Sequence, residues 1–373
     1  MRKHSLEQSP KFKGESDMQI KADGQSYAPK GKSVPVVAPG EFKVGAVGLD
    51  HGHIYGMCNG LSEAGAEIAL VYDPDTAKVK VFQEKFPSSV AASSEQEVME
   101  SDVKLIACAS VPSDRCDVGL RAMEHGKDFF VDKPAFTTRR QLEQARAAVQ
   151  ATSRKFAIYF SERLHVESAV YAEQLISQGA IGKVISVAGF GPHRLNAPSR
   201  PDWFFQPQRS GGILVDIGCH QIEQILFFAG AGDAEIVSSR IANYSAVAHP
   251  AFQDYGDAII TCDNGAAGYF RVDWFTPKGL GAWGDGRATI IGTDGYIELR
   301  KYLNVAADPD GDHVFMVNHE GEHHFKASGQ CGFPFFGRFI QDCIHRTETA
   351  ISQKHTFRVM ELAMDAQEKA IRL

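Results

Sequence analysis

The sequence has few of the features that mark membrane, secreted or nucleic-acid-binding proteins. Its 373 residues contain no uninterrupted apolar run of the about 20 residues that cross a bilayer. The seven cysteines lie at positions 58, 108, 116, 219, 262, 331 and 343. None has the C-x-x-C spacing of a thiolate zinc site, and an odd number cannot form a closed set of disulfides. The net charge of -7, without a Lys/Arg cluster, argues against binding to phosphate backbones. We therefore expect a cytoplasmic protein with no nucleic acid or membrane partner.

The amino-terminal 41 residues differ from the rest of the chain. They are rich in Lys, Gln, Ser, Gly and Pro and carry only isolated apolar residues, such as Leu6, Phe12 and Ile20. Such a segment cannot bury enough apolar surface to fold alone. It also lacks the apolar run of a secretory signal. We expect residues 1–41 to form an arm that lies on another subunit, with a flexible tail as the alternative.

From residue 42 the pattern alternates between strand and helix. Apolar runs predict strands at 42–48, 67–72, 104–109, 127–131 and 155–160. Helical patterns lie between them, at 54–64, in a segment that ends at 85, at 114–124 and at 139–149. This alternation implies right-handed βαβ crossovers. Residues 42–160 are therefore predicted to form an α/β Rossmann-like, doubly wound parallel sheet that binds a dinucleotide.

The pattern changes after residue 160. A helix is expected at 165–177, a strand at 183–191 and an irregular segment at 192–209. Strands follow at 235–244, 254–262, 266–274, 287–292 and 296–300, with hairpin turns at 263–265 and 293–295. Residues 161–350 are therefore predicted to be an α+β domain with a large, mostly antiparallel sheet that binds substrate and joins subunits. The last helices, at 335–345 and 357–372, should return to the first domain, with 351–373 packing on it.

The stretch from Gly211 to Glu223 places polar residues at helical spacing. At 3.6 residues per turn, Asp216, His220 and Glu223 fall on one face. A carboxylate beside an imidazole stabilises the imidazolium, so Asp216 should raise the pKa of His220 and make it a proton acceptor near neutral pH. The alternative is a helix N-terminus with a favourable Asp and an ordinary surface His.

A second motif, Asp132-Lys133-Pro134, follows the apolar run that ends at Val131. It places a Lys just beyond the carboxyl end of a predicted strand, where open parallel sheets bind their ligands. The two motifs resemble those of the Gfo/Idh/MocA family of sugar and cyclitol dehydrogenases. Asp132-Lys133-Pro134 is similar to the family's Glu-Lys-Pro motif, and Gly211 to His220 to its Gly-Gly-x-x-x-Asp-x-Gly-x-His motif. The resemblance extends over roughly residues 42–373.

The resemblance implies three catalytic residues. His220 would be the general base for a hydroxyl proton, Lys133 would polarise the reacting oxygen, and Asp216 would orient the base or hold a neighbouring hydroxyl. One family position differs, because the His expected four residues after a strand-end Pro is Cys116 here, after Pro112.

The resemblance also implies where the substrate binds and how subunits join. The irregular segment 192–209 corresponds to the family's substrate loop. Paired donors and acceptors suit a polyol, and we expect substrate contacts from Asp132, His193, Arg194 and Trp203. The open face of the antiparallel sheet would join subunits into a homo-oligomer, a dimer or tetramer.

The turn after the first strand lacks two glycines of the nucleotide-binding fingerprint. G-x-G-x-x-G would place glycines at 48, 50 and 53, but the chain has Gly48, Asp50 and His53. A carboxylate beside a pyrophosphate is unfavourable. Either the loop takes another path, with Gly52 close to the phosphates and His51 or His53 donating hydrogen bonds, or the cofactor binds weakly or not at all. We favour the first alternative.

The cofactor is predicted to be NAD rather than NADP. Asp73 ends the second predicted strand, 25 residues beyond Gly48, where an acidic residue can accept the ribose 2′-hydroxyl and repel a 2′-phosphate. Pro112, Asp132 and Lys133 complete the predicted cofactor site. The alternative for Asp73 and Pro74 is a plain turn and helix start.

Histidines and carboxylates also offer an alternative metal site, made from His51, His53, His193, His220, Asp50 and Asp216. Two histidines two residues apart in a Gly-containing loop can face one ion. The residues share no sustained ligand spacing, however, and Lys133 would bring a positive charge nearby. We therefore expect no metal.

The sequence as a whole favours an NAD-dependent oxidoreductase. It would move hydride between nicotinamide and a secondary hydroxyl of a sugar, cyclitol or glycoside. The alternatives are a lyase or glycosidase of the same fold, which reduces and reoxidises its bound NAD in each turnover, and a non-catalytic sugar-binding subunit that has lost cofactor affinity.

Overall fold

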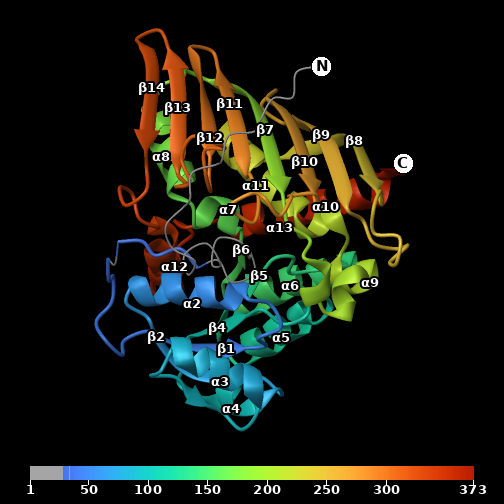
Figure 1. Cartoon of the computed structure of the whole chain (residues 1–373). Coiled ribbons are helices and arrows are strands. Elements are labelled where there is room, and N and C mark those ends of the chain that lie inside the picture. The colour runs from blue at the N-terminus through green and yellow to red at the C-terminus, as the bar shows by residue number, and fades with distance from the viewer. Residues whose placement is uncertain (1–27, 33) are drawn as a thin grey trace.

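The computed structural model describes residues 28–32 and 34–373, which form two sheets one above the other (Figure 1). Positions 1–27 and 33 of the expected arm lie outside the described residues. The described part of the arm follows the chain's own helix α2 (His53–Glu63). Asn59 donates a hydrogen bond to the Pro29 carbonyl at 3.0 Å, and Glu63 accepts one from the Gly31 amide at 3.0 Å. This part of the segment therefore packs on its own chain.

The first sheet has six parallel strands in the order β3-β2-β1-β4-β5-β6, which confirms the predicted Rossmann-like half. The strands are β1 (Lys43–Val47), β2 (Glu67–Tyr72), β3 (Val90–Ala91), β4 (Leu105–Cys108), β5 (Asp128–Asp132) and β6 (Phe156–Tyr159). The helices are α2, α3 (Thr76–Lys85), α4 (Glu95–Glu100), α5 (Pro112–Glu124) and α6 (Arg139–Thr152). Every residue of β4, β5 and β6 is buried, so these strands are continuous apolar runs rather than alternating ones.

The second sheet has nine strands in the order β14-β13-β12-β11-β7-β10-β9-β8-β15. Its strands are β7 (Val184–Pro192), β8 (Ala234–Ala242), β9 (Tyr255–Cys262), β10 (Ala267–Asp273), β11 (Arg287–Gly292), β12 (Gly295–Arg300), β13 (His313–Asn318), β14 (Gly321–Lys326) and β15 (Ile371–Arg372). Neighbours are antiparallel, except that β10 pairs with β7, and β15 with β8, in parallel. The prediction of a large, mostly antiparallel sheet is therefore confirmed.

Two hairpins of this sheet were predicted and a third was not. The turns at 263–265 and 293–295 join β9 to β10 and β11 to β12. The hairpin of β13 and β14 has no counterpart among the predicted strands. The sequence of β14, Gly-Glu-His-His-Phe-Lys, contains no β-branched residue and only one apolar one, so its pattern does not identify a strand.

The helices of the second half pack mostly on one face of the large sheet, but the helix Pro334–His345 packs on α2 of the first half. They are α7 (Ser161–Leu164), α8 (Glu167–Ser177), α9 (Pro207–Ser210), α10 (Ile213–Asp216), α11 (Gly218–Ala229), α12 (Pro334–His345) and α13 (Gln353–Lys369), with short 3₁₀ turns η2 (Ala197–Ser199) and η3 (Asp202–Phe205). Helix α11 lies close to β7, where a Cβ on Gly189 would come within 2.3 Å of the Gln221 side chain. Among the described residues, Pro207–Ala229 has the length and composition of a membrane span, but 89% of that window is buried in the fold, as in a core helix.

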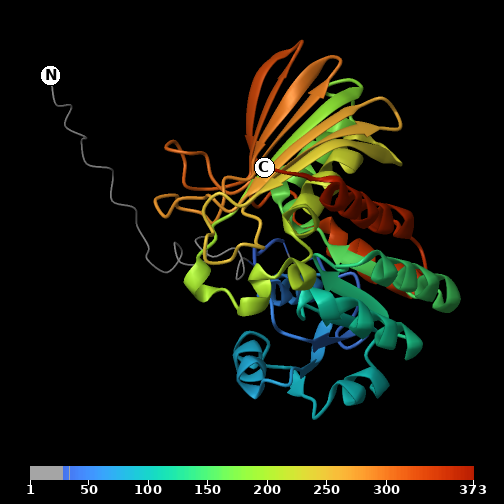
Figure 2. The same ribbon diagram turned by 90° about the vertical axis from the view of Figure 1, so that its right-hand side faces the viewer.

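The last long helix, α13, connects the two halves. In Figure 2 it lies, in red, between the large sheet and the Rossmann half. Gln353 hydrogen-bonds both backbone groups of Phe156 in β6, at 3.0 and 3.1 Å, and Arg139 of α6 donates to Glu368 at 2.9 Å. The helix thereby ties the orientation of the large sheet to the edge strand of the first sheet.

Candidate active site

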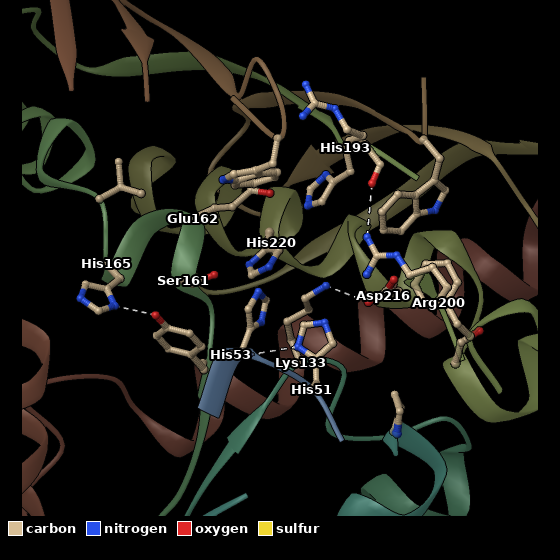
Figure 3. Close-up of a pocket in the computed structure, with 18 of the residues that line it drawn as sticks. His51, His53, Lys133, Ser161, Glu162, His165, His193, Arg200, Asp216 and His220 are labelled. Atoms are coloured by element: carbon tan, nitrogen blue, oxygen red, sulfur yellow. Dashed lines mark hydrogen bonds and ion pairs between the residues drawn. The ribbon is translucent and has the colours of Figure 1, made fainter. Parts of the chain in front are cut away.

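Lys133 follows β5 directly and lies at the boundary between the two halves. Its side chain is 5% exposed, and its Nζ atom donates to Asp216 at 2.8 Å (Figure 3). Burial lowers the pKa of Lys133, but Asp216 and Asp132 more than offset this and raise the pKa above its ordinary value. Lys133 is therefore a buried ammonium group held by a carboxylate from the other half of the chain.

The stretch that begins at Gly211 forms two short helices, so its polar residues do not share one continuous helical face. Gly211 and Gly212 both have positive φ, at 93° and 83°, and the helical segments α10 and α11 are separated at Ile217. Asp216 ends α10, and His220 lies in the first turn of α11. Both line the cavity, as does Lys133, but the partner of Asp216 is Lys133 and not His220. The third residue of the predicted face, Glu223, is bound elsewhere, at 2.7 Å from Arg163.

The expected rise in the pKa of His220 is wrong. His220 is 2% exposed, and burial lowers its pKa to about 3. The carboxylate that opposes this shift is Glu162 of α7, while Lys133 adds to the lowering. The Nδ1 atom of His220 and the Oε1 atom of Glu162 are both buried without a hydrogen-bond partner among the described residues. The sequence did not identify Glu162 as the partner because it lies 58 positions before His220.

Glu162 is held in place by its other oxygen. Oε2 accepts hydrogen bonds from Gln221 at 2.8 Å and from Lys301 at 3.0 Å, both of them buried. Burial raises the pKa of Glu162, but Lys301 outweighs it and keeps the pKa below the ordinary value. Glu162 is thus an ionised carboxylate in the cavity wall. Its place just after β6, at the same sheet edge as Lys133, is the signal that could have identified it.

The turn after β1 carries both a glycine turn and charged groups. Gly48 has φ of 74°, and a Cβ there would lie 2.6 Å from Ser110 Cβ. The Asp50 carboxylate accepts from Lys78 at 2.6 Å and from the Val111 amide at 3.2 Å. Lys78 therefore neutralises the carboxylate that would have opposed a pyrophosphate. Gly52 is the N-cap of α2 and offers no side-chain cap, while the His53 amide donates to His51 Nδ1 at 3.4 Å.

The histidines of this turn point to Asp132. His53 Nδ1 lies 2.7 Å from Asp132 Oδ1, and His51 Nδ1 lies 3.0 Å from Oδ2. The same carboxylate accepts from Arg115 at 2.8 Å and from the Lys133 amide at 2.8 Å. Asp132 is completely buried, so it lies behind the histidines and does not line the cavity itself. The predicted direct contact of Asp132 with substrate has no support in this geometry.

The surroundings of Asp73 match the alternative prediction, in which Asp73 and Pro74 form a plain turn and a helix start. Its carboxylate accepts from the Leu49 amide at 2.7 Å and from the Asp75 amide at 2.9 Å, and the residue is 4% exposed. Lys78 Nζ lies 3.9 Å away. Pro112, the other predicted cofactor residue of this edge, begins α5 and lines the cavity.

The opposite wall contains the predicted substrate residues. His193 follows β7 and packs against Trp274 and Trp283, with ring centroids 5.2 and 4.4 Å apart. Trp203, in η3, lines the cavity. Arg194 also lines it, but its guanidinium donates to three backbone carbonyls of the segment 277–282, the shortest at 2.6 Å. We therefore expect Arg194 to shape this wall rather than to bind a charged group.

The two walls enclose about 840 Å³ of empty space, part of it open to solvent. Cavity residues that the sequence analysis missed are Pro29, Arg115, Tyr159, Ser161, Glu162, His165, Val166, Arg200, Phe204, Ser210, Trp274, Trp283 and Tyr302. Most follow a strand end or sit in loops far apart in the chain, so only the tertiary fold brings them together. Of the alternative metal ligands, only His51 and His53 form a compact group, and they do so with Asp132.

Comparison with known proteins agrees with this architecture. Residues 42–161 match the model of the oxidoreductase family with an NAD-binding Rossmann fold, and residues 170–298 match the GFO/IDH/MocA C-terminal domain. A crystal structure from Erwinia carotovora atroseptica, provisionally described as an oxidoreductase, is 48% identical with a TM-score of 0.87 and covers 89% of this chain and 100% of that one. The chain therefore belongs to the GFO/IDH/MocA oxidoreductase family.

More distant relatives have named activities. The scyllo-inositol 2-dehydrogenase (NAD(+)) of Bacillus subtilis is 28% identical over 243 residues, which are 63% of this chain and 67% of that protein. A levoglucosan dehydrogenase in complex with NADH and levoglucosan has a TM-score of 0.72 at 17% identity, and the match covers 88% of this chain and 97% of that one. At that identity the second likeness establishes the fold alone.

The residues present fit a nicotinamide dinucleotide. Gly48 makes the tight turn, Gly52 puts no side chain at the N-cap of α2, and Lys78 holds Asp50 as an ion pair. Uncapped helix amides suit a pyrophosphate. The Nδ1 atoms of His51 and His53 face Asp132 and are therefore not directed at a pyrophosphate. That part of the predicted cofactor contact has no support in this geometry.

Proposed function

We propose that this protein is an NAD-dependent dehydrogenase that moves hydride between nicotinamide and a secondary hydroxyl of a sugar, cyclitol or glycoside. The observation that carries the proposal is the meeting of Lys133, Asp216 and His220 in one cavity, although they come from different halves of the chain. Sugar and inositol dehydrogenases among the relatives support the reaction class.

The bound cofactor would supply the hydride acceptor, held by Gly48, Gly52, Pro112 and Lys133. The protein's own task is to place the hydroxyl and manage its proton. Lys133 keeps its proton, since Asp216 raises its pKa, and can donate a hydrogen bond to the reacting oxygen. His220 faces the same cavity as candidate base, with Asp216 holding Lys133 rather than the imidazole.

The opposite wall suits a polyhydroxylated ring. Trp203, Trp274 and Trp283 offer apolar faces to C–H groups, and His193 and Glu162 lie among them with polar atoms. Burial lowers the pKa of His193 to about 4, so this ring is neutral near pH 7. Buried aromatic surface with a few oriented polar groups is typical of small-molecule sites.

We further propose NAD as the preferred cofactor and a cytoplasmic homo-oligomer as the working form. Asp73 puts a negative charge at the end of β2, which disfavours a 2′-phosphate. The face of the large sheet away from α11 exposes apolar side chains, among them Val237 at 59%, Ile259 at 51% and Ile291 at 42%. Two copies could cover one another there.

The test is an assay of the purified protein with NAD and a panel of inositols, aldoses and anhydrosugars, followed by NADH absorbance. We expect turnover on at least one unphosphorylated polyol, abolished in Lys133→Met. A cleaved or dehydrated product without net NADH would indicate a lyase or glycosidase instead. Failure to bind NAD in titration calorimetry would indicate a non-catalytic subunit.

A further inference from the structure

The turn after β1 contributes two imidazoles that nucleotide binding does not require. His51 lies in the turn and His53 begins α2, and both rings send Nδ1 to the carboxylate of Asp132, at 3.0 and 2.7 Å. An ionised carboxylate only accepts hydrogen bonds, so His53 Nδ1, which faces Asp132 alone, carries the ring proton. His51 Nδ1 also accepts from the His53 amide at 3.4 Å, so its contacts do not assign its proton. In the neutral His53 ring the lone pair is then on Nε2, and the structure thus fixes the tautomer of His53.

Asp132 is held firmly in its ionised form. It is completely buried, and besides the histidines it binds the Arg115 guanidinium at 2.8 Å. Burial raises the pKa of Asp132, but Arg115, His53 and His51 outweigh this and lower it well below the ordinary value. Asp132 therefore orients the rings and stabilises a positive charge on one of them without taking the proton itself.

The outer nitrogens of both rings reach the cavity. His51 and His53 line it, and their side chains are each 14% exposed. Neither Nε2 atom has a hydrogen-bond partner within residues 28–32 and 34–373, and neither is fully buried. In Figure 3 the His53 ring lies directly below His220, while His51 lies beside Lys133. His53 therefore offers an oriented, accessible lone pair at the place where the proposed substrate would bind.

We propose that His53, with Asp132 behind it, accepts the hydroxyl proton of the substrate; this inference rests on the proposed dehydrogenase function. In the oxidative direction the carbinol C–H bond breaks and its hydride goes to NAD⁺. The O–H bond breaks as its electron pair forms the carbonyl, and the proton goes to His53 Nε2. The resulting imidazolium keeps its Nδ1 hydrogen bond to Asp132 and later releases the proton to solvent. Reduction is the reverse.

Geometry favours His53 over the other two candidates. His220 has no carboxylate in hydrogen-bond contact with it, and its Nδ1 is buried without a partner among the described residues. His51 has the longer bond to Asp132 and lies beside the Lys133 ammonium. Burial lowers the pKa values of His51 and His220 to about 3, which opposes a proton on either. The His51 and His53 ring centroids are 4.3 Å apart, so the pair can hold one positive charge but not two.

Other groups around His53 set the pH response. The titratable and charged groups that face it are Asp132, Arg115, Lys133, His51, Tyr159, His165 and His220. Asp132 favours the imidazolium, while Arg115 and Lys133 oppose it. We expect the acidic limb of the pH profile of kcat/KM to respond to replacement of His53.

The kinetic test compares four glutamine variants, because Gln cannot take up a proton. His53→Gln should lower kcat by roughly 10²–10⁴-fold and abolish the acidic limb while NAD binding is retained. His51→Gln is the matched control at the same carboxylate and should keep the limb. His125→Gln, at an exposed helix end, should resemble the wild type. The proposal is overturned if His53→Gln keeps the limb and His220→Gln removes it.

A second readout does not depend on turnover. In ¹⁵N-labelled protein without ligands, ring chemical shifts should identify His53 as an Nδ1–H tautomer, and Asp132→Asn should change its shifts. An Nε2–H tautomer at His53 overturns the proposal. So does zinc or manganese that copurifies stoichiometrically and is lost in both His51→Gln and His53→Gln, because a metal would then occupy the lone pairs. A wild type inactive on every polyol rejects the proposed function instead, and the proton role with it.

Discussion

The two walls of the cavity satisfy their polar groups in different ways. On the Rossmann side, Asp132 alone takes four N–H donors, and Lys133 is paired with Asp216. On the side of α7 and α11, His220 Nδ1 and Glu162 Oε1 are buried without partners among the described residues. An unpaired buried polar atom is costly. The first wall is thus organised before any ligand arrives, whereas the second retains polar atoms that a hydroxylated ligand or a local rearrangement could satisfy.

The largest expected effect comes from a variant that disrupts the wall on the Rossmann side. Asp132→Asn leaves the buried Arg115 without its countercharge, and breaking a buried pair in this way costs about 3–5 kcal/mol of unfolding free energy. Urea unfolding followed by circular dichroism measures it. The control, Asp102→Asn, breaks an exposed pair with Lys43 and should change the unfolding free energy far less. Equal losses would mean that Asp132 is not a structural centre.

The next effect tests whether Lys133 and His220 act as a unit across the cavity. Lys133→Met should cut turnover by roughly 10²–10⁴-fold with NAD binding kept, whereas His220→Gln should cost less, because the proposed proton acceptor is His53. The double variant should cost little more than Lys133→Met alone. Single-turnover kinetics with a polyol identified in the panel provides the measurement. Additive losses would show that the residues serve separate steps.

Acid should weaken the protein through its buried histidines. Burial lowers the pKa values of His165 and His220 to about 3, so between there and about 6.5 the unfolded chain binds more protons than the folded one. Stability is then complete above pH 6.5 and falls as the pH drops, by about 1.4 kcal/mol per pH unit for each such histidine. Unfolding titrations at several pH values measure the slope. His220→Gln should reduce the slope of stability against pH by the contribution of one proton. An unchanged slope would contradict the low pKa of His220.

The smallest effect concerns the cofactor edge. Native protein should bind NAD more tightly than NADP, and Asp73→Ala should narrow that difference by less than about tenfold, since Lys78 already offsets part of the charge. Asp75→Ala, which removes the cap of α3, should leave the ratio unchanged. Fluorescence titration with both dinucleotides measures the two affinities. A native preference for NADP would reject Asp73 as the discriminating residue.

The fold could be predicted from local pattern, but the partners within the site could not. Strand β5 is a short apolar run followed directly by Lys133, so the strand and the position of this lysine could be predicted from neighbouring residues alone. The pairing of Asp216 with Lys133 joins residues 83 positions apart, and that of His53 with Asp132 spans 79. Helical spacing suggested Asp216 for His220 because periodicity only sees neighbours within a helix. The break at Ile217 and the nearby Lys133 gave the carboxylate another partner.

The four-donor arrangement at Asp132 also constrains how this chain can change over generations. Replacing His51, and His53 by the glycine usual at that position, would leave the carboxylate with Arg115 and one amide, and replacing Asp132 first would leave two imidazoles and a guanidinium without their anion. Each single step passes through a weakened protein. The turn after β1 and the end of β5 should therefore be inherited as a pair, so that lineages with one form of the turn rarely exchange it for the other.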